Sequence, residues 1–510
     1  MQQNYSFLPW QLSMRNKNNK NLCLFVTALL LTGPISAQET AESWYEEGRA
    51  IVERNLSYRY PNADIPIAKN VILFVGDGMG VSTVTAARIL EGQINGDYGE
   101  ENELFFETFP NVALSKTYNT DAQVPDSAGT MSAMVTGIKT DRGVLSVNQQ
   151  VTRSNCDSSL GNEVPTFLEI AEQKGMSTGI VSTARITHAT PAANYAHSVE
   201  RDHEDDRDVT RLTNPENCKD IASQLIELSA NIANSDGLEV ALGGGRRSFL
   251  QRIDGADPET GEPGERLDGR DLTQEWLAAH QNSAYVWNKR DFENIDINAT
   301  DHLLGLFQPS HMQYAYDNQS DKGGEPTLSE MTSKAIDLLS KNDKGFYLNV
   351  EGGRIDHAHH ALNPFRALMD TIEFSRAVKT AFEKVDLSET LIIVTADHSH
   401  TLTIAGYPSR GNPILGKVNA GDEPRLAGDG LPYTTLGYIN GRGQRNDLTD
   451  VDTAEESYRS EALIPLGSET HGGEDVPIYA AGAGSDLVRG VMEQHVIFHV
   501  MMEASKMADR

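Results

Sequence analysis

The stretch NVILFVGDGMG, residues 70–80, sets five consecutive apolar residues directly before a turn that carries an aspartate. Three other apolar runs have similar lengths, at residues 177–182 (STGIVS), 345–350 (GFYLNV) and 390–395 (TLIIVT). Their apolar residues do not alternate with polar ones, which is typical of strands buried on both faces. Helix-like stretches separate the runs, for example residues 164–175 and 329–342. The order predicts an α/β fold with a large, mostly parallel central sheet and helices on both faces.

Acidic residues, histidines and a threonine follow all four predicted strands. In chain order they are Asp77; His188 and Thr190; Glu351, Asp356 and His360; and Asp397 and His398. In open α/β sheets, ligands bind beyond the carboxyl ends of the strands. We therefore expect one site, assembled from several strand-end loops.

The spacing of these residues suits metal binding. Asp356 and His360 are four residues apart, so a helix would place both side chains on one face. Asp397 and His398 are adjacent, and His471 lies in a loop flanked by glycines. Nitrogen and oxygen donors without thiolates suit a zinc ion in an incompletely filled, catalytic site. All-oxygen candidates suit magnesium, and these are Asp77, Thr190 and Glu351.

Ser127 stands where a helix-like run begins, in QVPDSAGTMSAMVTG, residues 123–137. One interpretation is a helix cap, because serine and aspartate such as Asp126 satisfy free backbone N–H groups there. The other is a nucleophile aimed at an anion, because a helix N-terminus favours negative charge. The metal candidates also have plain alternatives, namely a solvated histidine patch, a strand-end turn and a capping aspartate. Their joint occurrence at strand ends favours a site.

Bulk composition limits the function classes. The chain has 510 residues, 39% of them hydrophobic, and a formal net charge of −30. Such an acidic chain lacks the basic footprint of a nucleic-acid-binding protein. Residues 401–468 are rich in Gly, Asn, Asp and Pro, and they predict an inserted, crown-like subdomain. Residues 254–271 predict a polar, flexible surface excursion.

The N-terminus has the pattern of an export signal. Basic residues precede an apolar run at residues 22–31, and small residues follow it, which predicts cleavage after Ala37. A membrane anchor is the alternative, but about ten apolar residues are too few to span a bilayer. Residues 1–37 are then a signal, and residues 38–510 are one periplasmic or secreted domain without a membrane span.

The cysteines fit an exported chain. Cys23 would leave with the signal, and Cys156 and Cys218 would remain as a pair in an oxidising compartment. An even number of cysteines there predicts a disulfide, with two buried free thiols as the alternative.

Six blocks of the sequence resemble, in order, those of the alkaline phosphatase family. They are NVILFVGDGMG, VPDSAGT, STARITHATPAANYAHSVERD, VEGGRIDHAHH, VTADHSH and ETHGGEDV, between Asn70 and His471. The resemblance is closest to the animal-type branch, because His188 and His357 stand where another, bacterial branch carries an aspartate and a lysine. Cys156 and Cys218 also fall where animal-type members place a disulfide. An exported bacterial member is expected.

The resemblance implies two zinc ions and one magnesium ion per subunit. Asp356, His360 and His471 would hold the first zinc ion. Asp77, Asp397 and His398 would hold the second, together with Ser127. Asp77, Thr190 and Glu351 would hold the magnesium ion, and His188 and His357 would lie beside these ligands. Arg201 would clamp the phosphoryl oxygens, steadied by Asp126. A calcium site of the animal-type members would fall on Glu259, Phe307, Gln308 and Glu325, although Gln308 stands where a glutamate is expected.

The function that the resemblance implies is hydrolysis of small phosphate monoesters through a phosphoserine at Ser127, with an alkaline pH optimum. The resemblance also implies a homodimer whose interface includes residues 401–468 and the segment around 40–56. Two alternatives belong to other functional classes. One is a sulfatase or phosphodiesterase of the same superfamily, and the other is a non-catalytic protein that binds phosphate or metal.

Overall fold

The computed structural model describes residues 40–57, 66–421 and 423–508. The predicted export signal, residues 1–37, lies outside the described residues. Within the described chain, no helix is both long enough and apolar enough to cross a membrane.

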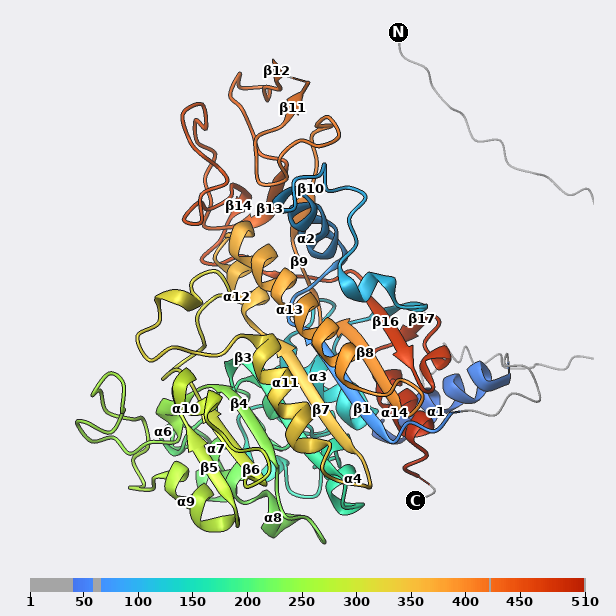
Figure 1. The fold of residues 1–510 in the computed structure, drawn as a ribbon, viewed down its shortest axis with the longest axis vertical. Helices are drawn as coiled ribbons and strands as arrows, with labels where there is room; N and C mark the ends of the chain where they lie inside the picture. Colours follow the sequence, from blue (N-terminus) through green and yellow to red (C-terminus); the bar gives the residue numbers. More distant parts are fainter. Residues whose placement is uncertain (1–39, 58–65, 422, 509–510) are drawn as a thin grey trace, which may run out of the picture. The chain divides into compact units, whose positions relative to one another are not determined.

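A ten-stranded sheet forms the centre of the fold (Figure 1). Its strands, in spatial order, are β17 (Gly490–Glu493), β2 (Asn111–Lys116), β16 (Val476–Gly482), β8 (Thr390–Ala396), β1 (Asn70–Gly76), β7 (Phe346–Gly352), β3 (Ser177–Arg185), β4 (Val240–Gly244), β6 (His302–Leu306) and β5 (Ser283–Val286). In this sheet β16 is antiparallel to both of its neighbours, and all the other pairs are parallel. The prediction of a mostly parallel sheet is confirmed.

The four strands predicted from the sequence are neighbours at the centre of this sheet. β1 pairs with β8 on one side and with β7 on the other, and β7 pairs with β3. Gly76 lies opposite both Gly352 and Ala396, while Ser182 lies opposite Glu351. The carboxyl ends of the four strands therefore reach the same edge of the sheet, and the loops that follow them start side by side.

Helices cover both faces of the sheet. One group packs together over β1, β3 and β7, and consists of α2 (Val81–Ile94), α11 (Leu328–Leu339), α12 (Arg354–His360) and α13 (Pro364–Lys384). The second group consists of α1 (Ala41–Ser57), α3 (Ser127–Thr136), α4 (Phe167–Gln173), α5 (Ala189–Ala192) and α14 (Val496–Ser505). Five further helices are α6 (Asp206–Val209), α7 (Ile221–Ile226), α8 (Leu228–Asn231), α9 (Leu272–Ala279) and α10 (Lys289–Glu293).

The strand β1 shows why the apolar runs do not alternate. Its residues Val71, Leu73 and Val75 belong to one buried core, whereas Ile72 and Phe74 belong to a second core. All five side chains are fully buried, since each face of the strand meets a layer of helices. A polar side chain on either face would have to enter an apolar core.

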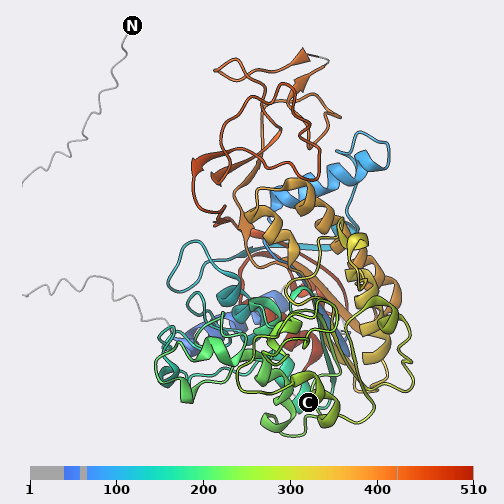
Figure 2. The same cartoon turned by 90° about the vertical axis from the view of Figure 1, so that its left-hand side faces the viewer.

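The inserted region carries small sheets of its own, which lie near one another in both ribbon views (Figures 1 and 2). β10 (Leu402–Ile404), β13 (Leu436–Gly441) and β14 (Ala462–Pro465) form one, and β11 (Asn419–Ala420) pairs with β12 (Glu423–Pro424). β10 packs against α2. At its borders, β9 (Ser399–His400) pairs with β15 (His471–Gly472), so that His400 faces His471.

Residues 254–271 are held more firmly than the sequence analysis predicted, since it expected a flexible surface excursion. Leu267 is exposed, as expected, but Asp257 and Arg266 are buried. The buried guanidinium of Arg246 binds Asp257 with a 2.7 Å contact and Glu259 with a 2.9 Å contact. Burial of a guanidinium requires carboxylates close by, and the segment supplies them.

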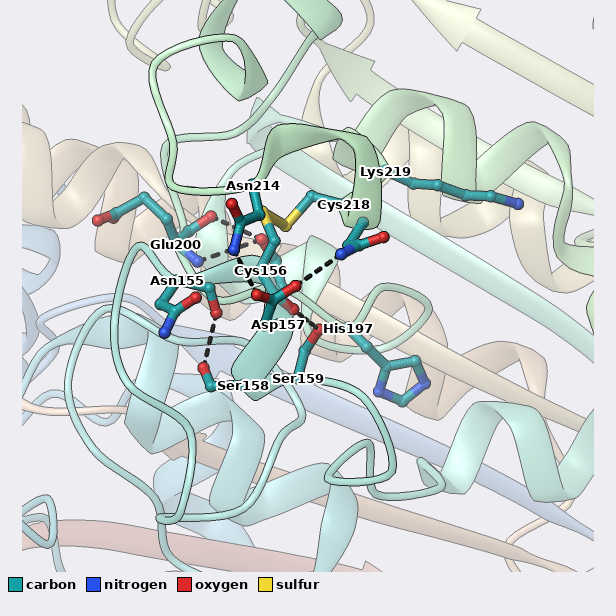
Figure 3. The surroundings of a disulfide bond; sticks show 12 residues. Asn155, Cys156, Asp157, Ser158, Ser159, His197, Glu200, Asn214, Cys218 and Lys219 are labelled. Atoms are coloured by element: carbon teal, nitrogen blue, oxygen red, sulfur yellow. Dashed lines mark hydrogen bonds between the residues drawn. A yellow bond between two sulfur atoms is a disulfide. The ribbon is translucent and has the colours of Figure 1, made fainter.

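The predicted disulfide joins Cys156 to Cys218, which are 62 residues apart in sequence (Figure 3). Asp157 beside the bridge accepts hydrogen bonds from Asn214 and Asn217, on the loop that leads to Cys218. The two loops are thus fastened by both covalent and polar links, and the alternative of free thiols is excluded.

Candidate active site

Ser127 is the first residue of α3, and Asp126 is its N-cap. An oxygen of Asp126 accepts a hydrogen bond from the backbone N–H of Gly129 at 3.1 Å. The hydroxyl of Ser127 is buried and faces the strand-end loops. Its Oγ lies 3.1 Å from Nε2 of His398 and 3.4 Å from Oδ1 of Asp77. The aspartate therefore supplies the cap, while the serine points into the site.

The strand-end residues converge around this serine in three groups. Asp356, His360 and His471 form the first: Nε2 of His360 lies 3.2 Å from Oδ1 of Asp356 and 3.2 Å from Nε2 of His471. Asp77, Asp397 and His398 form the second, with Nε2 of His398 3.3 Å from each carboxylate. Asp77 and Glu351, together with His188, form the third. Each of these residues was named as a candidate from the sequence, but His311, His400 and Glu469, which belong to further groups of this kind, were not.

The three histidines of the first two groups are oriented alike. Nδ1 of His360 faces the carbonyl of Glu469 at 2.7 Å, and Nδ1 of His471 faces the carbonyl of Pro125 at 2.8 Å. Nδ1 of His398 faces the carbonyl of Ser399 at 3.2 Å. A carbonyl only accepts, so Nδ1 carries the proton in each neutral ring and Nε2 presents a lone pair. When both rings are neutral, the Nε2 lone pairs of His360 and His471 face each other, and a metal cation or a proton between them removes the repulsion.

Buried carboxylates concentrate negative charge at the same place. Asp77, Glu351, Asp356 and Asp397 are all buried. Burial, with Asp397, Asp356 and Glu351 nearby, raises the pKa of Asp77 well above its ordinary value. Burial likewise raises the pKa of Glu351 to about 7. Buried charges of one sign require compensation, and bound cations supply it.

Several polar atoms in the site lack protein partners. Oδ2 of Asp77, Oδ2 of Asp397, Oε1 of Glu351 and Oγ1 of Thr190 are buried without hydrogen bonds to the described residues. Such atoms are uncommon, because an unsatisfied buried oxygen costs about 1–3 kcal/mol. Thr190, at the start of α5, adds a neutral oxygen beside Glu351 of the third group. The first two groups offer mixed nitrogen and oxygen donors, and the third offers the oxygens of Asp77, Glu351 and Thr190 with His188 beside them.

Arg201 lies in the loop that follows α5. Its Nη1 donates to Oδ2 of Asp126 at 3.0 Å, and the same oxygen accepts from the N–H of Gly143 at 3.0 Å. Its Nη2 lies 3.3 Å from Nε2 of His188. The side chains of Arg201 and Asp126 are 16% and 18% exposed, so the pair is shielded but open to a small ligand.

Sequence reasoning missed His400 and Glu469. Nε2 of His400 lies 2.7 Å from Oδ1 of Asp356, and its Nδ1 lies 2.6 Å from Oε2 of Glu469. Between two carboxylates, and despite burial, its pKa rises to about 10, so the ring is protonated and donates to both. The available signal was the His398-x-His400 spacing, because alternate residues of an extended chain share a face.

His359, by contrast, belongs to the core. Its Nε2 contacts Oγ1 of Thr83 at 3.0 Å, and its Nδ1 contacts the hydroxyl of Tyr438 at 2.8 Å. The HAHH run is therefore not a solvated patch, since each of its histidines has partners of its own in the protein.

The calcium candidates lie in a separate place, around an aspartate that sequence reasoning missed. Nε2 of Gln308 donates to Oδ1 of Asp321 at 2.6 Å, and Oε1 of Glu259 accepts from the N–H of Gly323 at 3.3 Å. Burial, with Asp321 nearby, raises the pKa of Glu325 to about 8. Oδ2 of Asp321 and Oε2 of Glu325 have no hydrogen-bond partner among the described residues. Phe307 is buried against Phe292.

Comparisons with known proteins show what the chain is similar to. A family model described as "Alkaline phosphatase" matches residues 68–507. The tissue-nonspecific isozyme of alkaline phosphatase from Gallus gallus is 43% identical over 480 residues, covering 92% of this chain and 90% of that protein. An alkaline phosphatase from Gadus morhua is 42% identical over 473 residues, covering 91% and 96% of the two chains.

Solved structures share the fold. The alkaline phosphatase of the Antarctic bacterium TAB5 superposes with a TM-score of 0.59 at 24% identity, covering 87% of this chain and 99% of that one. At this identity the likeness concerns the fold alone.

Proposed function

The chain belongs to the alkaline phosphatase family, and on that premise we propose how its residues carry out phosphate-monoester hydrolysis. The protein is a phosphoric monoester hydrolase. The observation that carries the proposal is the position of the Ser127 hydroxyl, 3.1 Å from His398 and 3.4 Å from Asp77, at the meeting point of the strand-end loops. Ser127 is the nucleophile in this proposal.

Three metal sites follow from the three groups of donors. Asp356, His360 and His471 would hold one zinc ion. Asp77, Asp397 and His398 would hold the second zinc ion, together with Ser127. Asp77, Thr190 and Glu351 would hold a magnesium ion. When bound, these ions supply positive charge that offsets the phosphate dianion and lowers the pKa of nearby hydroxyl groups. His400 and Glu469 are positioning residues in this scheme, because His400 fixes the orientation of Asp356.

The proposed reaction consists of two displacement steps. Oγ of Ser127 attacks phosphorus in line and loses its proton while the ester P–O bond breaks. The departing alkoxide takes up one proton and leaves as the alcohol, and the phosphoryl group stays on Oγ. Water then attacks the phosphoserine and releases inorganic phosphate. Arg201 offers a planar fork to two phosphoryl oxygens, which a lysine could not match. Because the attacking water must lose a proton, the rate rises toward alkaline pH.

Asp126 and the start of α3 support the nucleophile. Asp126 holds the Arg201 fork from one side while it caps the helix that carries Ser127. The backbone dipoles at that helix start favour the anion that develops beside Ser127. One side chain thus fixes the nucleophile and the clamp relative to each other.

Related chemistries are the main alternatives. A sulfatase or phosphodiesterase of the same superfamily would share the metal donors, and a binding protein would share the pocket. The Arg201 fork favours a terminal phosphoryl group, because a diester has fewer free oxygens to grip. The complete donor set beside a serine hydroxyl argues against a binding protein without turnover.

Rates on matched esters of one aryl alcohol test the proposal. We expect the phosphate monoester to be hydrolysed at least 100-fold faster than the diester or the sulfate ester. Activity should disappear after chelation with verified metal removal and return with zinc and magnesium. Faster turnover of the diester or the sulfate, or full activity of the metal-free protein, would contradict the proposal.

Further proposals concern assembly, location and calcium. A homodimer would bury exposed apolar side chains of the 401–468 region, where Tyr407 is 89% exposed and Leu463 is 82% exposed. The disulfide and the export-like N-terminus support a periplasmic or secreted protein. A calcium ion would be held near Glu259, Phe307, Gln308 and Glu325, where Asp321 adds a carboxylate that offsets the missing glutamate.

A further inference from the structure

Three histidines from three different loops meet beside Arg201. His188 follows β3, His311 follows β6, and His357 lies on α12. The ring centroids of His311 and His357 are 4.1 Å apart, and that of His188 lies 5.2 Å from His311 and 5.5 Å from His357. All three residues are partly exposed. With Arg185 and Arg354 they form what we call the histidine–arginine cluster. His188 also lies beside Asp77 and Glu351 in the third donor group, but no residue of the cluster is a ligand in the proposed metal sites.

Each ring of the cluster faces an arginine. Nη2 of Arg201 lies 3.3 Å from Nε2 of His188, and Nη1 of Arg354 lies 3.1 Å from Nδ1 of His357. Arg185 reaches His311 at both ring nitrogens, with its backbone N–H at Nδ1 and its Nη1 at Nε2. Arginine only donates, so each of these ring nitrogens would have to accept.

A neutral imidazole accepts at one nitrogen and donates at the other. A ring nitrogen that accepts from an arginine carries no proton, so the contacts with arginine require neutral rings. Each ring therefore keeps one N–H. Nδ1 of His188 has no acceptor among the described residues, and donors reach His311 at both of its nitrogens. The cluster thus offers more donors than acceptors.

The cluster also carries positive charge that no ion pair offsets. Arg185 binds Glu204 with a 2.5 Å contact, and Arg201 binds Asp126. Arg354 stacks on the ring of Tyr314, 3.8 Å from its centroid, and makes no ion pair with a described carboxylate. The three histidines are close enough together to hold a metal ion, but the arginines that contact their ring nitrogens would repel a cation and would have to be displaced. An anion would find donors and an unpaired guanidinium.

We propose that the histidine–arginine cluster is a subsite for a second anionic group, a phosphate or a carboxylate, on the leaving group of the ester. The proposal rests on the proposed function, because Arg201 places the transferred phosphoryl group next to His188. It assigns a specificity role to His311 and Arg354. The preferred substrates are then phosphate monoesters with a second anionic group a few atoms away from the ester.

A pair of alkyl phosphates tests the subsite. Propyl phosphate and propane-1,3-diol bisphosphate differ by one phosphate, and kcat/KM is compared per hydrolysable group. We expect the native enzyme to prefer the bisphosphate by about tenfold, as one charge-assisted contact provides. His311→Gln and Arg354→Gln should each reduce this preference at least fivefold. Arg290→Gln removes an arginine that is 84% exposed on α10, and it should leave the preference unchanged.

The outcomes separate the subsite from the reaction. A preference that also falls as salt rises supports an ionic subsite. Hydrolysis of propyl phosphate with no preference for the bisphosphate, or with a preference that survives both substitutions, would overturn the subsite and leave the proposed function standing. Failure of the metal-loaded enzyme to hydrolyse either ester would overturn the proposed function itself. If one variant does not fold, the other decides the question.

Discussion

Replacing Asp126 by asparagine should separate its two roles. One oxygen of Asp126 accepts from the N–H of Gly129 and caps α3, and the other accepts from Arg201 and Gly143, each at 3.0 Å. An asparagine can still turn its amide oxygen toward Gly129, but its NH₂ group then faces the guanidinium and repels it. The cap should survive, whereas Arg201 should lose its fixed orientation.

The structure sets the size of both effects. The Asp126–Arg201 pair is shielded, with side chains less than one fifth exposed, so a charge-assisted bond of about 1.5–3 kcal/mol is expected. At 1.4 kcal/mol per factor of ten, Asp126→Asn should lower kcat/KM by roughly ten- to 100-fold. Asp126→Ala should in addition lose the cap, which is worth about 1 kcal/mol. Its free energy of unfolding should fall by about 2–4 kcal/mol in total.

A second N-cap provides the control. Asp271 caps α9 by accepting from the N–H groups of Thr273 and Gln274. Asp271→Ala should therefore cost about 1 kcal/mol of stability and leave kcat/KM for an aryl phosphate unchanged. Denaturant unfolding gives the stabilities, and initial rates give kcat/KM. The reasoning is refuted if Asp126→Asn keeps full kcat/KM, or if Asp271→Ala loses as much activity.

Three further results are expected. The double variant Cys156→Ser/Cys218→Ser should lose about 4 kcal/mol of unfolding free energy, because the bridge closes a loop of 62 residues, and a loss below about 1 kcal/mol would contradict this. Burial raises the pKa of Glu172 from 4.5 to about 7, so the stability that protonated Glu172 contributes is fully present below pH 4.5 and is lost as the pH rises to 7. Over that window the free energy of unfolding of Glu172→Gln should rise by up to about 3 kcal/mol relative to that of the native protein. Equal pH profiles of stability for the two proteins would be inconsistent with the burial effect. Sedimentation should give a dimer, whereas a monomer at micromolar concentration would exclude the proposed assembly.

Much of the fold could be predicted because each signal was local. The four central strands are apolar on both faces, and β1 shows the cause, since Val71 and Ile72 enter different cores. The strand-end rule then placed Asp77, Glu351 and Asp397 in one site before any contact was known. Helical spacing correctly put Asp356 and His360 on one face of α12.

The missed residues depend on contacts that sequence spacing does not show. His311 follows β6 and meets His357 only because β4 and β6 extend the sheet on the far side of β3. Glu469 reaches His400 through the pairing of β9 with β15. Asp257 and Arg266 lie in a segment whose composition is typical of exposed loops, but they are buried and form ion pairs with Arg246 and Asp220 outside that segment. Most of the residues that the sequence analysis missed are thus polar residues whose partners are distant in the sequence.

Capture of the covalent intermediate tests the central claim most directly. The metal-loaded enzyme is mixed with an aryl phosphate, quenched in acid within milliseconds and digested, and the peptides are analysed by mass spectrometry. The account predicts one phosphorylated residue, Ser127, and no phosphopeptide from a Ser127→Ala variant that still binds its metals. A phosphoryl group on another residue, or rapid turnover by Ser127→Ala, would contradict it.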